Sequence, residues 1–265
     1  MPIVAALRVV AVLGAARMEG RTMTYCVGML LDEGLVMASD SRTNAGVDRV
    51  STFRKMFHFE RPGERTMCLV TAGNLSVTQA AVGYLKERLA QDDIPTLYNA
   101  PNLFEAARVV GDTLREVYDR DREHLEGHGV AFTAEAIFGG QIGDASPRLF
   151  RIYGAGNFIE ASAETAYFQI GETKYGKPIL DRIVELAMSL SEAARCALIS
   201  FDSTMRANIS VGPPIDLFCY RKDGHGQTFR RRFQEDDPDW VRIRAGWAEG
   251  LKRAFADLPD PGWEI

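Results

Sequence analysis

The chain has 265 residues, of which 46% are hydrophobic and 25% are charged, and its net charge at pH 7 is −5. This length and composition predict a soluble globular protein with one substantial core. The weakly acidic balance gives no support to nucleic-acid binding. The four cysteines show no C-x-x-C or Cys/His ligand spacing. We therefore expect reduced core thiols in a cytoplasmic protein, with no disulfide and no bound metal.

Residues 1–23 are an apolar segment that ends in Met23, directly before Thr24. A secretory signal is one interpretation, but no basic region precedes the apolar stretch and Arg8 interrupts it. The stretch is also too short to span a membrane. A propeptide that is removed to free Thr24 is the second interpretation. We favour a third, in which a start codon has been assigned too early, because removal of Met23 before a small residue would itself expose the amine of Thr24.

The next segment predicts strands joined by tight turns. Two short apolar runs flank an acidic glycine turn, which indicates a hairpin. A strand that starts at Thr24 would place this residue at a sheet edge, with Asp40 beside it at the end of the returning strand. Residues 43–54 are polar and predict a loop. The four expected strands are 25–31, 35–39, 55–60 and 66–72.

Helices and strands alternate in blocks along the rest of the chain. Apolar residues recur at helical spacing in five segments, the first with Ser76 as its N-cap. Further strands are expected within 131–170 and 210–233. This order predicts an α+β fold, a four-layer α-β-β-α sandwich of two antiparallel sheets in residues 24–235, followed by a helical extension in residues 236–265. The five expected helices are 76–89, 104–125, 177–190, 191–207 and 240–258.

Four residues of the first segment suggest nucleophilic chemistry. The hydroxyl of Thr24 is a weak nucleophile unless a base takes its proton, and a free α-amine on the same residue, with a pKa of roughly 7.7–8, can do so. Lys55 would hold the developing negative charge of the hydroxyl oxygen, and Asp40 would pair with Lys55. The backbone N–H of Gly73 could face an oxyanion without obstruction by a side chain.

These motifs together resemble the N-terminal-nucleophile threonine hydrolases of the proteasome β-subunit type, and among them the bacterial ancestral β-subunit group called Anbu. The resemblance extends over residues 23–235. It implies the same sandwich fold, a threonine nucleophile, hydrolysis of peptide bonds and assembly of identical subunits into a ring or spiral. The sequence motifs that carry it are M-T-Y-C-V-G, A-S-D-S-R-T-N-A-G, R-K-M-F, T-A-G-N and S-F-D-S-T-M-R-A-N-I-S-V-G-P-P-I-D.

The chain departs from this family at two expected site positions. Glu172 lies where proteasome subunits usually carry a serine that supports the N-terminal amine, and a carboxylate there would raise the pKa of that amine or anchor it as an ammonium. Asp202 matches the second acidic residue of the family. The serine usually found three residues later is replaced by Met205, and Ser203 or Thr204 could take its place.

The sequence therefore predicts a threonine peptidase that acts on peptides or unfolded proteins and needs no cofactor. A non-proteolytic scaffold protein on the same fold is the alternative from another class, and Glu172 is its main support. An amidase that acts on small molecules with the same nucleophile is a second enzymatic alternative. The chain has no P-loop, so an ATP-driven unfolding step would require a separate unfoldase as partner.

Overall fold

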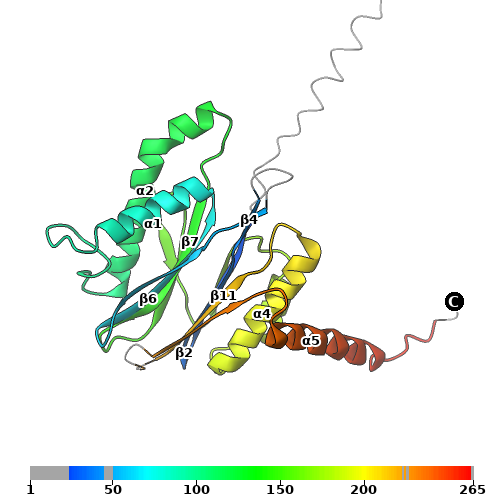
Figure 1. The fold of residues 1–265 in the computed structure, drawn as a ribbon. Helices are drawn as coiled ribbons and strands as arrows, with labels where there is room; N and C mark the ends of the chain where they lie inside the picture. The colour runs from blue at the N-terminus through cyan, green and yellow to red at the C-terminus, as the bar shows by residue number, and fades with distance from the viewer. Residues whose placement is uncertain (1–23, 45–49, 223, 225–226, 264–265) are drawn as a thin grey trace, which may run out of the picture.

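The structure is a computed structural model that describes residues 24–44, 50–222, 224 and 227–263. Two five-stranded antiparallel sheets stack face to face, and helices cover both outer faces (Figure 1). The predicted α-β-β-α sandwich is therefore confirmed. The segment 1–23, to which the start-site, propeptide and signal interpretations refer, lies outside the described residues.

The first sheet contains the strand that begins after Thr24. This strand lies inside the sheet, because β10 pairs with it on the side away from β2, and Thr24 directly precedes its first residue. The strands of this sheet, in spatial order, are β10 (Tyr167–Gly171), β1 (Tyr25–Leu31), β2 (Gly34–Asp40), β11 (Ile215–Arg221) and β12 (Thr228–Phe233).

The second sheet faces the first and is also antiparallel throughout. Residues 43–54, expected as a loop, include a short hairpin formed by β3 (Arg42–Asn44) and β4 (Val50–Thr52). The strands of the second sheet, in spatial order, are β5 (Met56–Arg61), β6 (Arg65–Gly73), β7 (Ala134–Ile142), β8 (Arg148–Ile152) and β9 (Phe158–Glu160).

Three apolar clusters hold the layers together. One lies between the two sheets, and each of the others lies between a sheet and the helices that cover it. Strands β1 and β2 are buried along almost their whole length because both of their faces are covered. The helices over the second sheet are α1 (Leu75–Glu87) and α2 (Leu103–Gly127), and those over the first are α3 (Lys177–Ile183) and α4 (Leu190–Ala207) (Figure 1).

Capping residues explain where the predicted helix boundaries are wrong. The N-cap of α1 is Asn74, not Ser76, because the Asn74 side chain accepts a hydrogen bond from the Ser76 N–H. The helix expected over 177–190 ends early, at Ile183. Ser189 and Glu192 form a capping box that starts a separate helix at Leu190.

The last helix, α5 (Pro238–Ala256), is joined to the sandwich mainly at its first turns. Trp240 is fully buried in the cluster beneath α4, while Phe255 is 77% exposed. We expected this helix either to cover an edge of the core or to dock on a neighbouring subunit. Its N-terminal part does the first, and its C-terminal part extends away from the sandwich (Figure 1). No helix among the described residues is long and apolar enough to cross a membrane.

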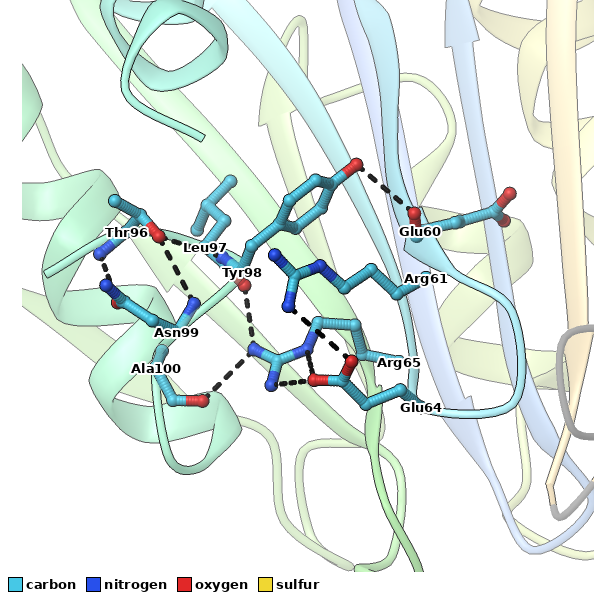
Figure 2. A network of polar contacts seen from close by, with 9 residues as sticks. All are labelled: Glu60, Arg61, Glu64, Arg65, Thr96, Leu97, Tyr98, Asn99 and Ala100. Carbon is cyan, nitrogen blue, oxygen red and sulfur yellow. Dashed lines mark hydrogen bonds and ion pairs between the residues drawn. The ribbon is translucent and has the colours of Figure 1, made fainter. Parts of the chain in front are cut away.

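A buried arginine ties the β5–β6 hairpin to the segment between α1 and α2 (Figure 2). The Arg65 guanidinium donates to the backbone carbonyls of Leu97 and Ala100 at 3.0 and 3.1 Å. It also pairs with Glu64 at 2.5 and 2.9 Å. Tyr98, from the same segment, donates to the Glu60 carbonyl at 3.2 Å. Because buried carbonyls need donors, these contacts fix the path of the segment that leads into α2.

We expect Arg65→Met to destabilise the protein by about 2–4 kcal/mol, because the two buried carbonyls lose their donors. Urea unfolding followed by circular dichroism would measure this. Arg61→Met is the matched control, since that guanidinium is 46% exposed, lies 3.6 Å from Glu64 and should matter little. Equal effects of the two substitutions would contradict the assigned role of Arg65.

Candidate active site

The hydroxyl of Thr24 lies at the end of β1 in contact with a buried lysine. Lys55 Nζ donates to Thr24 Oγ1 at 2.7 Å. Thr24 is itself buried, so its hydroxyl is held in a fixed environment. Lys55 directly precedes β5, and its carbonyl accepts a hydrogen bond from the Thr71 N–H of β6 at 3.0 Å. The second sheet thus positions the lysine, and the first sheet positions the threonine.

The ammonium of Lys55 is also held by two oxygens on the other side. It donates to Asp40 Oδ1 at 2.9 Å and to the Arg42 carbonyl at 2.6 Å. The side chains of Lys55 and Asp40 are only 6% and 0% exposed. A buried ion pair with further hydrogen bonds fixes the ammonium firmly. This cation, next to a hydroxyl oxygen, can stabilise the alkoxide that forms when the hydroxyl loses its proton.

Asp40 is the anion of this pair. Burial raises the pKa of its carboxyl to about 6, although the charge of Lys55 and a hydrogen bond from it lower that pKa. The Tyr25 N–H also donates to Asp40 Oδ1, at 3.2 Å. One carboxylate oxygen therefore links the backbone next to the threonine with the lysine. Above about pH 6 the carboxylate is charged and can hold Lys55 in place.

Tyr25 anchors the start of the strand beside Thr24. Its hydroxyl donates to Ser200 Oγ at 3.0 Å and accepts from Gln169 Nε2 at 2.8 Å, and all three side chains are buried. Burial raises the pKa of the Tyr25 hydroxyl well above its ordinary value, so it stays protonated. No role was predicted for Tyr25 from the sequence. Its position directly after Thr24 was the available signal.

Gly73 ends β6 close to this group, and its backbone requires glycine. Its φ is +114°, and a Cβ there would lie 2.3 Å from the Thr133 carbonyl oxygen. Backbone N–H groups two residues apart on a strand point the same way. Since the Thr71 N–H bonds to the Lys55 carbonyl, the Gly73 N–H points to the same side, beyond the start of β5. This direction suits an oxyanion donor.

Glu172 lies directly opposite Thr24 at the end of β10. Its backbone N–H donates to the Thr24 carbonyl at 2.8 Å. Its side chain accepts hydrogen bonds from Asn208 Nδ2 at 3.1 Å and from the Lys174 N–H at 3.3 Å. The structure therefore brings the backbone of Glu172 to the threonine. The Glu172 carboxylate contacts Asn208, a residue that was not predicted from the sequence.

Asp202 lies in α4, and the described contacts of its carboxylate are with two arginines. Oδ2 accepts from Arg206 at 3.0 Å, and Oδ1 accepts from Arg244 of α5 at 2.6 Å. The structure thus uses this carboxylate to join α5 to α4 and does not place it with Thr24. Asn208, six residues further along, is the residue of this region that reaches Glu172.

Thr24, Lys55 and Asp40 thus combine a hydroxyl, a cation and its counter-ion in one buried group. The family model described as "Proteasome subunit" matches residues 21–218 of the 265. The chain belongs to the proteasome subunit family. A curated relative of this proteasome-family chain is the proteasome subunit beta of Haloquadratum walsbyi. The two are 25% identical over 219 residues, which is 82% of each chain.

Several solved structures of Anbu (ancestral β-subunit) proteins are similar to this proteasome-family chain. The Anbu of Yersinia bercovieri is 48% identical with a TM-score of 0.85, and the match covers 91% of this chain and 100% of that one. The Pseudomonas aeruginosa protein, described as a helical assembly of the Anbu complex, is 46% identical with a TM-score of 0.85, over 90% and 98% of the two chains. These matches confirm the resemblance found in the sequence.

Proposed function

We propose that this chain is a threonine peptidase whose nucleophile is the hydroxyl of Thr24, freed as the N-terminal residue. The observation that carries the proposal is the contact of 2.7 Å between Lys55 Nζ and Thr24 Oγ1, backed by the buried Asp40 carboxylate. A cation held at this place favours loss of the hydroxyl proton. Membership of the proteasome subunit family supports the same chemistry.

In the proposed reaction, Thr24 Oγ1 attacks the carbonyl carbon of a peptide bond. The proton of the hydroxyl passes through a water to the α-amine of Thr24, while Lys55 stabilises the oxygen as it becomes negative. The Gly73 N–H donates to the carbonyl oxygen in the tetrahedral intermediate. The C–N bond then breaks, the amine product leaves with the proton, and an ester to Thr24 remains. Water hydrolyses this ester and restores the hydroxyl.

The proposed substrates are peptides or unfolded proteins, and the proposed location is the cytoplasm. We further propose that identical subunits assemble into a ring or spiral, which the helical assembly described for the similar Pseudomonas aeruginosa protein supports. A separate ATP-dependent unfoldase would supply unfolded substrates. The scaffold alternative rests on Glu172, and the small-amidase alternative shares the nucleophile. Peptides and acylated small amides, assayed side by side, separate the two enzymatic functions.

The test is to compare a chain that begins at Thr24 with one that retains residues 1–23. The chain with the free α-amine should cleave peptides and react with a threonine-directed electrophile at Thr24, because only it has the general base. Intact mass and N-terminal sequencing define the two chains before the assay. If the chain that begins at Thr24 neither cleaves a peptide library nor reacts with the electrophile, the scaffold function is favoured instead.

A further inference from the structure

The loop that follows α4, residues 208–212, contacts the candidate site at three places. Asn208 Nδ2 donates to Glu172 Oε2 at 3.1 Å. The Ile209 carbonyl accepts from Arg42 Nη1 at 2.9 Å. The backbone of Gly212 lies beside the Asp40 carboxyl and lowers its pKa. Residues that lie far apart in the sequence thus meet at one short segment.

The side-chain amide of Asn208 is held in a defined orientation. Its Oδ1 accepts from the Ser210 N–H at 3.0 Å, and its backbone N–H donates to the Thr204 carbonyl at 2.8 Å. With Oδ1 occupied by a donor, the other end of the amide, Nδ2, is directed at Glu172. The loop therefore presents a hydrogen-bond donor and not a charge to this carboxylate.

Glu172 connects this donor to the threonine. Its backbone N–H donates to the Thr24 carbonyl at 2.8 Å, and the preceding Gly171 approaches so closely that a Cβ there would lie 2.1 Å from that oxygen. A shift of the Glu172 backbone would therefore displace the backbone of Thr24. Through this contact Asn208 limits the position of the nucleophile's backbone.

Arg42 connects the loop to the lysine. Its carbonyl accepts from Lys55 Nζ at 2.6 Å, and its guanidinium packs against Gly212. A Cβ at Gly212 would lie 2.4 Å from Arg42 Cζ. Glycine at this position thus leaves the space in which Arg42 reaches the Ile209 carbonyl. The loop holds the lysine through Arg42 as it holds the threonine through Glu172.

We propose that residues 208–212 are a positioning element of the threonine site, in which the Asn208–Glu172 hydrogen bond sets the place of Thr24 and Gly212 sets that of Arg42. The inference rests on the proposed peptidase function and adds Asn208 and Gly212 as positioning residues. Because the reacting atoms must be aligned closely, a small shift of either partner should slow the chemical step more than it weakens substrate binding.

The experiment uses chains that begin at Thr24 and measures kcat and KM separately for each variant. Titration with a threonine-directed electrophile gives the concentration of active sites, so that kcat is expressed per active site. Asn208→Asp places two carboxylates against each other, and we expect kcat to fall about tenfold with KM nearly unchanged. Adding Glu172→Gln to this variant again pairs one amide with one carboxylate. The amide donor is now on the side chain at position 172, and the carboxylate acceptor is on the side chain at position 208. This double variant should recover kcat to within about threefold of the native value.

Asn102→Ala is the matched control, because its side chain accepts from a backbone N–H at the start of α2, away from the site. Its kcat per titrated site should equal that of the native chain.

Gly212→Ala, which displaces Arg42, should lower kcat as Asn208→Asp does. If Asn208→Asp leaves kcat unchanged, or if Glu172→Gln fails to restore kcat, the positioning role of residues 208–212 is wrong, while the proposed peptidase function is unaffected. If Thr24→Ala leaves turnover unchanged, both are wrong.

Discussion

Thr24→Ala is expected to lower kcat/KM for every cleaved peptide by at least about a thousandfold, because the variant has no oxygen to form the ester. Lys55 Nζ contacts the hydroxyl oxygen of Thr24 at 2.7 Å. The substitution removes this oxygen, which is the proposed attacking atom. Steady-state kinetics with fluorogenic peptides, together with electrophile labelling followed by mass spectrometry, measure the loss.

Thr24→Ser is the matched control for this substitution. It keeps the hydroxyl and the α-amine and removes only a methyl group, so it should retain measurable turnover and labelling. Thr24→Ala should be as stable as the native chain to within about 1–2 kcal/mol, since the change removes one hydrogen bond and two heavy atoms. Native turnover by Thr24→Ala would show that another group is the nucleophile and would reject the proposed function.

The local part of the fold could be predicted from the sequence. Acidic residues and Gly34 form the turn of the hairpin of β1 and β2. Asp40 lies next to the start of β1 because both strands have seven residues. Gly34 has a φ of +144°, which explains why the turn needs glycine. Short-range chemistry of this kind can be recognised from neighbouring residues alone.

The contacts between distant segments could not be derived in the same way. Asp202 and Asn208 lie on the same helix and its C-cap, and both are polar. The sequence pattern does not show that Arg244 of α5 neutralises the first while the second reaches Glu172. The family resemblance favoured the acidic residue over the amide. Which of the two faces the site depends on how α4 packs on the sheet, and that is set by residues far away in the chain.

Lys55→Ala should both lower the activity strongly and destabilise the fold, and the two effects can be separated. It removes the cation beside the Thr24 hydroxyl, so kcat should fall by at least about a hundredfold. It also leaves the fully buried Asp40 carboxyl without its counter-ion, which should cost about 3–5 kcal/mol of unfolding free energy near neutral pH. Peptide kinetics and urea unfolding measure the two quantities.

The pH dependence of this destabilisation identifies its cause. In the native protein the pKa of Asp40 is about 6, above its value of about 3.9 in an unfolded chain. A raised carboxyl pKa means that the folded state binds the proton more tightly, so this group stabilises the fold at low pH and its contribution is lost as the pH rises. Without Lys55 the pKa rises further, because the charge that lowers it is gone. Lys55→Ala should therefore be much less destabilising at pH 5 than at pH 8.

Asp40→Asn in the Lys55→Ala background separates the structural role from the chemical one. This double variant has no buried charge to neutralise, so its stability should return toward that of the native chain and should lose the pH dependence between pH 5 and 8. Its peptidase activity should stay as low as that of Lys55→Ala, because no cation stands beside the hydroxyl. Recovery of activity together with stability would mean that Lys55 only neutralises Asp40, and the proposed role of the ammonium in stabilising the Thr24 alkoxide would be wrong.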